Sequence, residues 1–191
     1  YLREGILGRA IHRGILRVDV LNLRDYAEDK HKSTDDRPFG GGSGMVMMPG
    51  PISKALRSME PLQGRSVSIL LSPQGRPFNQ AMAWELAEMD QIVLICGRYE
   101  GVDERILELF ADREISAGDY VLSGGELPAL MVMDAVARLI PDVLGGERST
   151  FEDTFEDGLL EYPQYTRPRV FMGREVPAVL LSGDHERIRL W

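Results

Sequence analysis

Residues 67–101 read VSILLSPQGRPFNQAMAWELAEMDQIVLICGRYEG, and this stretch decides the fold class. It contains two apolar runs, residues 67–71 and 92–96, which are typical of buried β-strands. Between them, apolar side chains recur at the spacing of one helix face: Phe78, Met82, Leu86 and Met89. A strand, a helix and a second strand in this order predict an α/β domain with a largely parallel sheet.

Shorter patterns on either side predict further elements. Alternation of apolar and charged residues over 16–21 predicts a half-exposed strand, and the apolar run 120–122 predicts a third buried strand. Asp103 is suited to cap a short helix that ends at Phe110. The chain therefore continues to alternate strands with helices beyond the central stretch.

Residues 127–140 form an almost wholly apolar segment, which predicts a helix buried against the sheet or against another subunit. Pro128 suits its first turn, and Pro141 ends it. Its charged residues, Asp134 and Arg138, are four apart and could form an intrahelical ion pair. Alternatively, Arg138 points into a functional pocket, because a buried guanidinium needs a defined partner.

Composition and charge limit the class of protein. The chain has 191 residues, of which 43% are hydrophobic and 27% charged, as in one globular domain with at most a small appendage. Its net charge is −8, so nucleic acid would have to bind through local basic patches. The single cysteine favours a reducing compartment, and the three histidines form no zinc motif. No apolar run is long enough to cross a membrane.

Four glycine-rich corners carry the unusual chemistry. The first corner is residues 40–45 (GGGSGM), the second 72–76 (SPQGR), the third 97–101 (GRYEG) and the fourth 116–126 (SAGDYVLSGGE). The second and third directly follow predicted strands, where open α/β sheets bind ligands. None matches GxxxxGK or GxGxxG, which disfavours an NTPase or an NAD enzyme. Together they predict a small-molecule site built from backbone groups, although each alone could be an ordinary turn.

Two charged segments add candidates for recognition and catalysis. Residues 31–37 (HKSTDDR) mix both signs of charge directly before the first corner, which suits recognition rather than packing. Residues 149–158 (STFEDTFEDG) are acidic and predict a loop. A carboxylate of such a loop could be solvated, or it could lie over a pocket as a general base.

In this order, the segments resemble the bacterial tRNA (guanine-N1)-methyltransferase family of the SPOUT superfamily. The matching stretches are residues 29–45, 71–76, 96–105, 118–128 and 165–168, and the likeness extends over nearly the whole chain. The resemblance implies an α/β fold with a SPOUT-type, largely parallel sheet and a deep C-terminal trefoil knot. It also implies a cytoplasmic homodimer. Residues 1–160 would form the knotted cofactor-binding domain, and residues 161–191 a linker and the start of a tRNA-binding domain.

The same resemblance implies that S-adenosyl-L-methionine binds in the second, third and fourth corners. Backbone groups of residues 117–122 would hold the adenine. By matched position, the residues that line the cofactor site are Pro73, Gly97, Tyr99, Glu100, Gly101, Ala117, Gly118, Asp119, Tyr120, Val121, Leu122, Gly124 and Gly125.

The implied reaction transfers a methyl group to N1 of the guanosine immediately 3′ of the tRNA anticodon. Guanine N1 carries a proton, so a base must remove it and a cation should stabilise charge on O6. The matched residues are Asp153 as general base and Arg138 as the cation, while Glu152 and Asp157 compete for the role of base. Family members need Mg²⁺, for which Glu100 and the acidic loop are candidates; no metal ligand is assigned.

Contact with tRNA is expected from the segment before and within the first corner: His31, Lys32, Asp36, Arg37, Gly41 and Gly42. The chain departs from the family pattern at Ala117, where a larger aliphatic residue is common, and at Glu161, where aspartate is frequent. It also begins at Tyr1 without the family's first strand and ends at Trp191 without its C-terminal helical domain. We therefore expect it to bind the cofactor but to methylate tRNA poorly.

Two other functions stay open at this point. One is a SPOUT methyltransferase that acts on a ribose 2′-hydroxyl or a different base, which has less need of a carboxylate placed like Asp153. The other is a non-catalytic module that binds a nucleotide or RNA through the glycine corners. Cys96 ends an apolar run, which favours a buried small hydrophobe over a nucleophile.

Overall fold

The computed structural model describes residues 1–59, 64–144 and 162–191. The chain separates into two compact units, Tyr1–Phe151 and Glu152–Trp191. The predicted domain boundary at residues 160/161 lies outside the described ranges.

The first unit is built on a three-stranded sheet with the order β4-β3-β5. Strand β3 (Ser66–Pro77) lies in the centre and pairs in parallel with β4 (Gln91–Cys96) and with β5 (Arg113–Ser116). The predicted parallel α/β architecture is therefore confirmed, as are the predicted strands at 67–71 and 92–96. The trefoil knot stays a prediction.

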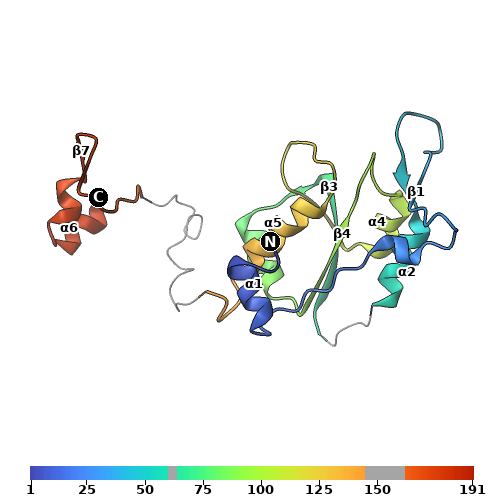
Figure 1. The fold of residues 1–191 in the computed structure, drawn as a ribbon, viewed down its shortest axis with the longest axis horizontal. Helices are drawn as coiled ribbons and strands as arrows, with labels where there is room; N and C mark the ends of the chain where they lie inside the picture. Colours follow the sequence, from blue (N-terminus) through green and yellow to red (C-terminus); the bar gives the residue numbers. More distant parts are fainter. Residues whose placement is uncertain (60–63, 145–161) are drawn as a thin grey trace. The chain divides into compact units, whose positions relative to one another are not determined.

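Helices cover both faces of this sheet, because the side chains of β3 alternate between them. Val67, Ile69 and Leu71 face one core, which they share with α3 (Gln80–Ala87) and α5 (Glu126–Ala137). Leu70 faces a second core, with α2 (Pro49–Ser58) and α4 (Glu104–Phe110). Figure 1 shows α5 on one side of β3 and β4, and α2 and α4 on the other.

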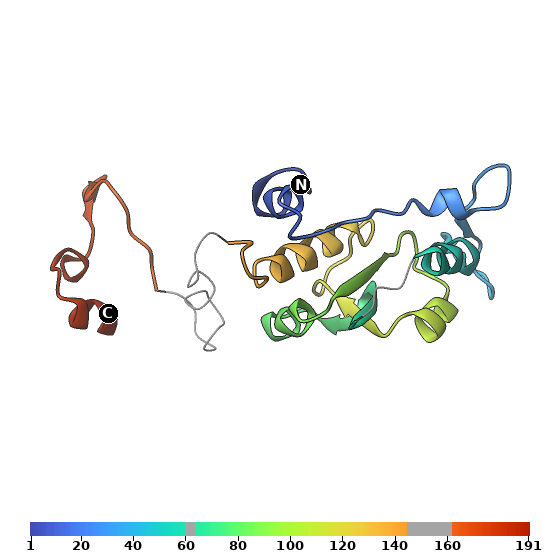
Figure 2. The same cartoon turned by 90° about the horizontal axis from the view of Figure 1, so that it is seen from below.

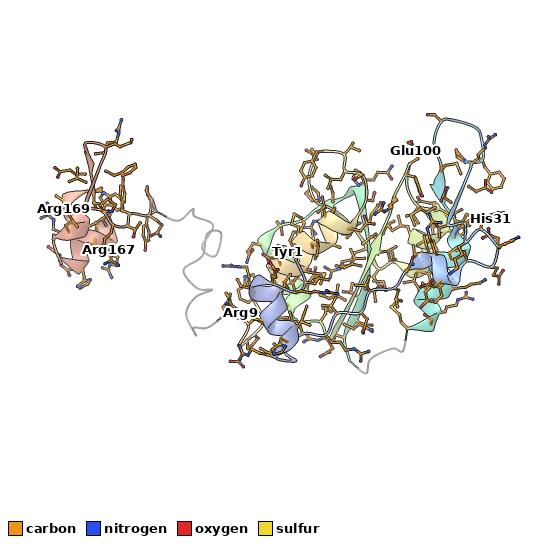
Figure 3. All side chains as sticks on the ribbon, viewed as in Figure 1. Tyr1, Arg9, His31, Glu100, Arg167 and Arg169 are labelled. Atoms are coloured by element: carbon orange, nitrogen blue, oxygen red, sulfur yellow. The ribbon has the colours of Figure 1, made fainter. Side chains whose placement is uncertain are left out.

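The N-terminal helix α1 (Gly5–His12) packs against α5 (Figure 2). Leu7 and Ala10 of α1 share a small buried cluster with Ala137 and Val143. At the start of the chain, the Tyr1 hydroxyl donates a hydrogen bond of 2.9 Å to the Asp134 carboxylate, and Figure 3 shows Tyr1 beside α5. The N-terminal segment therefore fixes the helix that carries Arg138.

Two predicted helix features are observed in α4 and α5. Asp103 caps α4 as predicted, and its carboxylate accepts a hydrogen bond of 3.1 Å from the main-chain N–H of Arg105. Helix α5 begins one residue earlier than predicted, and Pro128 lies within its first turn. It ends at Ala137, three residues before the predicted end at Ile140, so that a turn at Arg138 ends the helix before Pro141 is reached. Within the described single chain, one face of α5 is buried, whereas Leu127 on the other is 62% exposed.

Two predicted strands are wrong. Residues 120–122 lie in an irregular loop, and Val121 is 88% exposed, so this apolar run marks a surface rather than a core. The strand of this region is β5, which the charges of Arg113 and Glu114 obscure in the sequence. From Leu16 to Val18 the side chains alternate between half-buried and exposed, as predicted, but residues 16–21 have no regular secondary structure. Alternation cannot tell whether a neighbouring strand is available for pairing.

Small elements carry the segments that precede and follow the first corner. The 3₁₀ helix η1 (Leu23–Tyr26) packs on α2. Strands β1 (Asp35–Asp36) and β2 (Val46–Met47) pair antiparallel and bring together the two ends of the loop that contains the first corner.

In the second unit, a hairpin joins β6 (Val170–Phe171) to β7 (Arg174–Glu175), and η2 (Ala178–Leu181) and α6 (His185–Leu190) follow. The hairpin turns at Met172 and Gly173, which both have positive φ. Arg167 and Arg169 precede β6 in the chain, and Figure 3 labels both in this unit. Among the described residues of the chain, no helix has the length and apolar character needed to cross a membrane.

Candidate active site

The second corner is an excursion in the middle of β3. Ile115 of β5 is the register partner of both Leu71 and Arg76, so residues 72–75 leave the ladder and return to the same place. The excursion folds closely over β5: a Cβ built on Gly75 would lie 2.4 Å from the main-chain nitrogen of Ile115. Only glycine fits this approach of two backbones.

The third and fourth corners are held together by main-chain groups. The N–H of Gly125 donates a hydrogen bond of 2.8 Å to the carbonyl of Gly97, and Arg98 forms a β-bridge with Gly124. A Cβ on Gly125 would lie 2.8 Å from the Cα of Cys96. Glycine at 125 therefore permits α5 to begin directly against the end of β4.

The fourth corner also contacts the chain just after the second. The N–H of Phe78 donates to the carbonyl of Ser116 at 2.9 Å, and Ser116 is buried. The Ser116 hydroxyl bonds main-chain atoms of Gly118, and the Tyr120 hydroxyl donates to the carbonyl of Ala117 at 3.0 Å. These bonds shape residues 116–120 into a compact turn.

The first corner meets the third at Glu100. The N–H of Glu100 donates to the carbonyl of Met45 at 3.0 Å, and the N–H of Met47 donates to the carbonyl of Gly101 at 2.9 Å. A Cβ on Gly44 would overlap the Glu100 side chain. Figure 3 shows Glu100 beside the loop of the first corner. The first, third and fourth corners are thus joined by backbone hydrogen bonds, and the chain that follows the second corner is bonded to the fourth through Phe78 and Ser116.

An ion pair reinforces the contact between the third and fourth corners. The Arg98 Nε donates to the Glu126 Oε1 at 2.6 Å, and both side chains are about half exposed. The hydrogen bond to Glu126 raises the pKa of the Arg98 guanidinium, and the charge of Glu126 adds to this effect. The pair links the end of β4 to the first turn of α5.

Tyr99 holds a backbone conformation that is unusual for a side-chain-bearing residue. Its φ is +61°, in the left-handed region, and its ring is 53% exposed. Such strain persists only where the surroundings fix the backbone, and it is most frequent at functional sites. Its neighbours Arg98 and Glu100 are both held by the contacts above.

The structure brings the predicted cofactor residues of the second, third and fourth corners into this network. Gly97 and Gly125 of the predicted set bond one another and so join two of the corners. The remaining residues of the predicted set lie on the same three loops, and the exposed ones are Pro73, Tyr99, Glu100, Asp119, Tyr120, Val121 and Leu122. Main-chain N–H and C=O groups of glycine-rich loops at fixed positions suit the edge of an adenine and a charged amino-acid moiety.

Of the two predicted catalytic residues, the structure describes one. Arg138 is the C-cap of α5 and is half-buried. Asp153 lies outside the described residues, as do Glu152 and Asp157. Among the described residues, no group of three or more His, Cys, Asp or Glu side chains is arranged to hold a metal ion.

The predicted RNA-contact residues lie on the surface around η1, β1 and the first corner. His31, Lys32, Asp36 and Arg37 are exposed, and Gly41 and Gly42 have positive φ. Asp36 lines an open cavity of about 470 Å³, together with Glu28, Asp29, Asp35 and Lys54. The four carboxylates make this cavity unsuitable for a phosphate, whereas His31, Lys32 and Arg37 do not line it.

Comparison with known proteins gives the family of the chain. The family described as "tRNA (Guanine-1)-methyltransferase TrmD" matches residues 1–191. The chain belongs to this methyltransferase family. Its resemblance to the family, inferred above from five separate stretches, is thereby confirmed.

Curated relatives of this family are similar over nearly the whole chain. A tRNA (guanine-N(1)-)-methyltransferase of Carboxydothermus hydrogenoformans is 53% identical over 190 residues, which are 100% of this chain and 74% of that protein. Relatives with the same name from Dictyoglomus turgidum and Moorella thermoacetica are 57% and 55% identical. The match with the Dictyoglomus turgidum protein includes 97% of this chain and 75% of that protein, and the match with the Moorella thermoacetica protein includes 100% and 77%.

Sequence reasoning about the methyltransferase site missed three residues that shape the corners. Ser116 is buried and joins the chain after the second corner to the fourth, while Arg98 and Glu126 form the ion pair. Arg98 and Glu126 are 28 residues apart, so their spacing carried no signal. The signal that was available lies in their glycine neighbours, which allow the two loops to approach.

Cys96 is predicted to be chemically inert in the folded methyltransferase. Burial, together with the negative charge of Glu126, raises the pKa of its thiol to about 11. Alkylation by iodoacetamide requires the thiolate, so the rate should stay low through pH 9 and increase only as the pH approaches 11. In guanidinium chloride the thiol should titrate near its ordinary pKa. Rapid alkylation of the native protein at pH 8 would contradict this assignment.

Proposed function

We propose that this chain transfers a methyl group from S-adenosyl-L-methionine to N1 of the guanosine immediately 3′ of the anticodon in tRNA. Family membership across residues 1–191 carries this proposal. The backbone network of the second, third and fourth corners supports it, because glycine-rich loops beyond parallel strands suit a nucleoside ligand. A reducing, cytoplasmic location accords with the single cysteine and with tRNA as the substrate.

The fourth corner and the residues beside it would hold the cofactor, which supplies an electrophilic methyl group when bound. Residues 117–122 present main-chain groups for the adenine, and the Glu100 carboxylate is exposed at the third corner, where it could meet a positive charge. The contacts of Gly97 with Gly125 keep the two loops in register. Preorganised loops of this kind reduce the entropy lost when the reacting atoms are aligned.

The proton on guanine N1 has to leave before N1 can act as a nucleophile. We assign Asp153 as the carboxylate that accepts this proton and Arg138 as the cation that stabilises negative charge on O6. The position of Arg138 at the end of α5, half-buried, supports the second role. Mg²⁺ belongs to the proposal as a requirement of transfer, with Glu100 and the acidic loop as candidate ligands.

A homodimer and a trefoil knot complete the proposed architecture. Apolar side chains are exposed on α5 and on the fourth corner, notably Leu127 at 62% and Val121 at 88%, which supports a subunit interface there. The close crossing of Gly75 over the backbone of Ile115 supports a knotted path for the second corner. Sedimentation of the chain should give twice the mass of 21.4 kDa.

Calorimetric titration with S-adenosyl-L-methionine tests the cofactor site. The wild type should bind about one equivalent per chain, and Gly125→Ala should bind at least about tenfold more weakly, because its Cβ would meet the backbone of Cys96. Gly125 has φ −77°, which alanine adopts freely, so the expected effect is steric. Gly50→Ala is the matched control, since a Cβ at Gly50 has no atom within 4 Å. Equal binding by all three proteins would contradict this placement.

Digestion of methylated tRNA to nucleosides tests the reaction itself. The product should be 1-methylguanosine, and its formation should fall when EDTA removes Mg²⁺, while cofactor binding persists. Formation of 2′-O-methylguanosine would instead show a ribose methyltransferase. Cofactor binding without transfer to any tRNA would favour the non-catalytic module.

A further inference from the structure

Phe39 is an aromatic side chain held entirely in solvent. Its exposed fraction is 101%, the highest among the large hydrophobic residues that the structure describes. It lies in the loop between β1 and β2, which projects from the body of the first unit (Figure 1). A free phenyl ring leaves a large apolar area in contact with water. Covering this area with a flat partner lowers the free energy, because apolar surface is removed from water.

The backbone around Phe39 keeps the ring away from the rest of the unit. Gly40, Gly41 and Gly42 follow it, with φ of +86°, +85° and +120°, and a Cβ on any of them would have no atom within 4 Å. The two ends of the loop, by contrast, are anchored. Asp35 pairs with Met47 in the β1–β2 ladder, and Met45 accepts the hydrogen bond from Glu100. The loop of residues 37–45 is therefore a stalk that is anchored at both ends, and Phe39 and the three glycines form its open tip.

The exposed cation beside the tip favours a nucleic acid as the partner of the ring. Arg37, two residues before Phe39, is exposed, and its main-chain N–H bonds the carboxylate of Asp36 at 2.7 Å. The Asp29 carboxylate is likewise engaged, with the N–H and hydroxyl of Ser33. An exposed cation next to a free aromatic ring is a combination with which proteins bind single-stranded RNA.

We infer that Phe39 is a stacking platform for one unpaired base of the RNA substrate. The inference rests on the proposed function, which supplies the RNA, and it specifies how a loop nucleotide is held. The stalk is tied to the third corner through Glu100, so an RNA loop stacked at its tip is bound to the same unit as the proposed methyl donor. Stacking accepts any base, so Phe39 contributes affinity and placement rather than sequence readout.

Binding of an unmodified tRNA transcript to the 191-residue chain at low salt tests this inference. Phe39→Leu keeps an apolar side chain but removes the aromatic face, and it should weaken binding roughly 5- to 150-fold. Phe39→Tyr should bind like the wild type. Leu109→Ala, which removes an exposed apolar side chain on α4, should have no effect. Affinity for S-adenosyl-L-methionine should be the same in all four proteins.

Two further measurements separate stacking from a structural or electrostatic role. Phe39→Leu should leave the slope of log affinity against log salt unchanged, whereas Arg37→Gln should reduce it by about 0.7, the loss of one phosphate contact. Tryptophan fluorescence of Phe39→Trp, measured against the wild type, should be quenched when the transcript binds. An abasic nucleotide at one position of the anticodon loop should abolish the difference between Phe39 and Phe39→Leu.

The outcomes distinguish this inference from the proposed function. If the wild type methylates guanosine N1 but Phe39→Leu binds the transcript equally well, the stacking role is wrong. It is also wrong if the effect of Phe39→Leu persists with an abasic nucleotide at every loop position. A shift of the sedimenting mass in Phe39→Leu would assign the ring to a subunit contact instead. If the wild type binds no tRNA at all, the proposed function and the stacking role are both overturned.

Discussion

Gly75→Ala is expected to disrupt the folded first unit and, with it, cofactor binding. The new Cβ would lie 2.4 Å from the main-chain nitrogen of Ile115 and 2.6 Å from the carbonyl carbon of Glu114. Both contacts are with backbone, which cannot rotate away as a side chain can. Overpacking in close-packed structure lowers the free energy of unfolding by about 1–3 kcal/mol and occasionally more. We expect a loss at the upper end of this range for Gly75→Ala. The expected fall in Tm is roughly 6–12 °C, measured by calorimetry.

Gly50→Ala is again the control, because the same change of one methyl group enters open space in the first turn of α2. It should leave Tm within about 2 °C of the wild type, since a surface substitution of this kind changes stability by less than about 0.5 kcal/mol. If Gly75→Ala melts like the wild type and binds S-adenosyl-L-methionine equally well, the excursion of β3 does not depend on backbone approach at this position.

Asp153→Asn is expected to reduce methyl transfer by about 10²- to 10⁴-fold, the usual contribution of a positioned general base. Asparagine has nearly the same shape but cannot accept the N1 proton. Affinities for the cofactor and for tRNA should change little, so single-turnover transfer measured at saturating concentrations of both is the appropriate assay.

The two neighbouring carboxylates supply matched controls for the base. Glu152→Gln and Asp157→Asn remove one negative charge each from the same acidic segment and should retain most of the activity. A large loss in either control, with Asp153→Asn active, would transfer the role of base to that residue. Equal, small losses in all three would argue against a carboxylate base and in favour of a different methyl acceptor.

The central sheet could be predicted from the sequence because each of its two longest strands contains a run of mainly apolar residues. Residues 67–71 and 92–96 have no charged residue to interrupt the pattern, and both become strands, the first mostly buried and the second half-buried around Ile95. Strand β5 escaped prediction because only Ile115 and Ser116 of its four residues are buried, too few to show a period. The exposed run 120–122 shows the converse error, since hydrophobicity alone does not distinguish a core from a binding or subunit surface.

The corners of the site could be predicted as glycine-rich turns, but their mutual contacts could not. The approach of Gly75 to Ile115 joins residues 40 positions apart, and that of Gly125 to Gly97 joins residues 28 apart. Such contacts depend on strand order, which local patterns do not contain. Asp103 was predictable as a helix cap, by contrast, because its partner Arg105 lies two residues away.

The dependence of the corners on main-chain atoms has a consequence for inhibitor design. An inhibitor that hydrogen-bonds the peptide groups of residues 117–122 would contact atoms that every amino acid shares. Resistance by a change of side chain would then require a steric clash, and at Gly75 or Gly125 that clash falls on the backbone that shapes the site. Substitutions at these glycines should reduce the activity of the enzyme as well as the binding of the inhibitor, so resistance to such a compound should be rare.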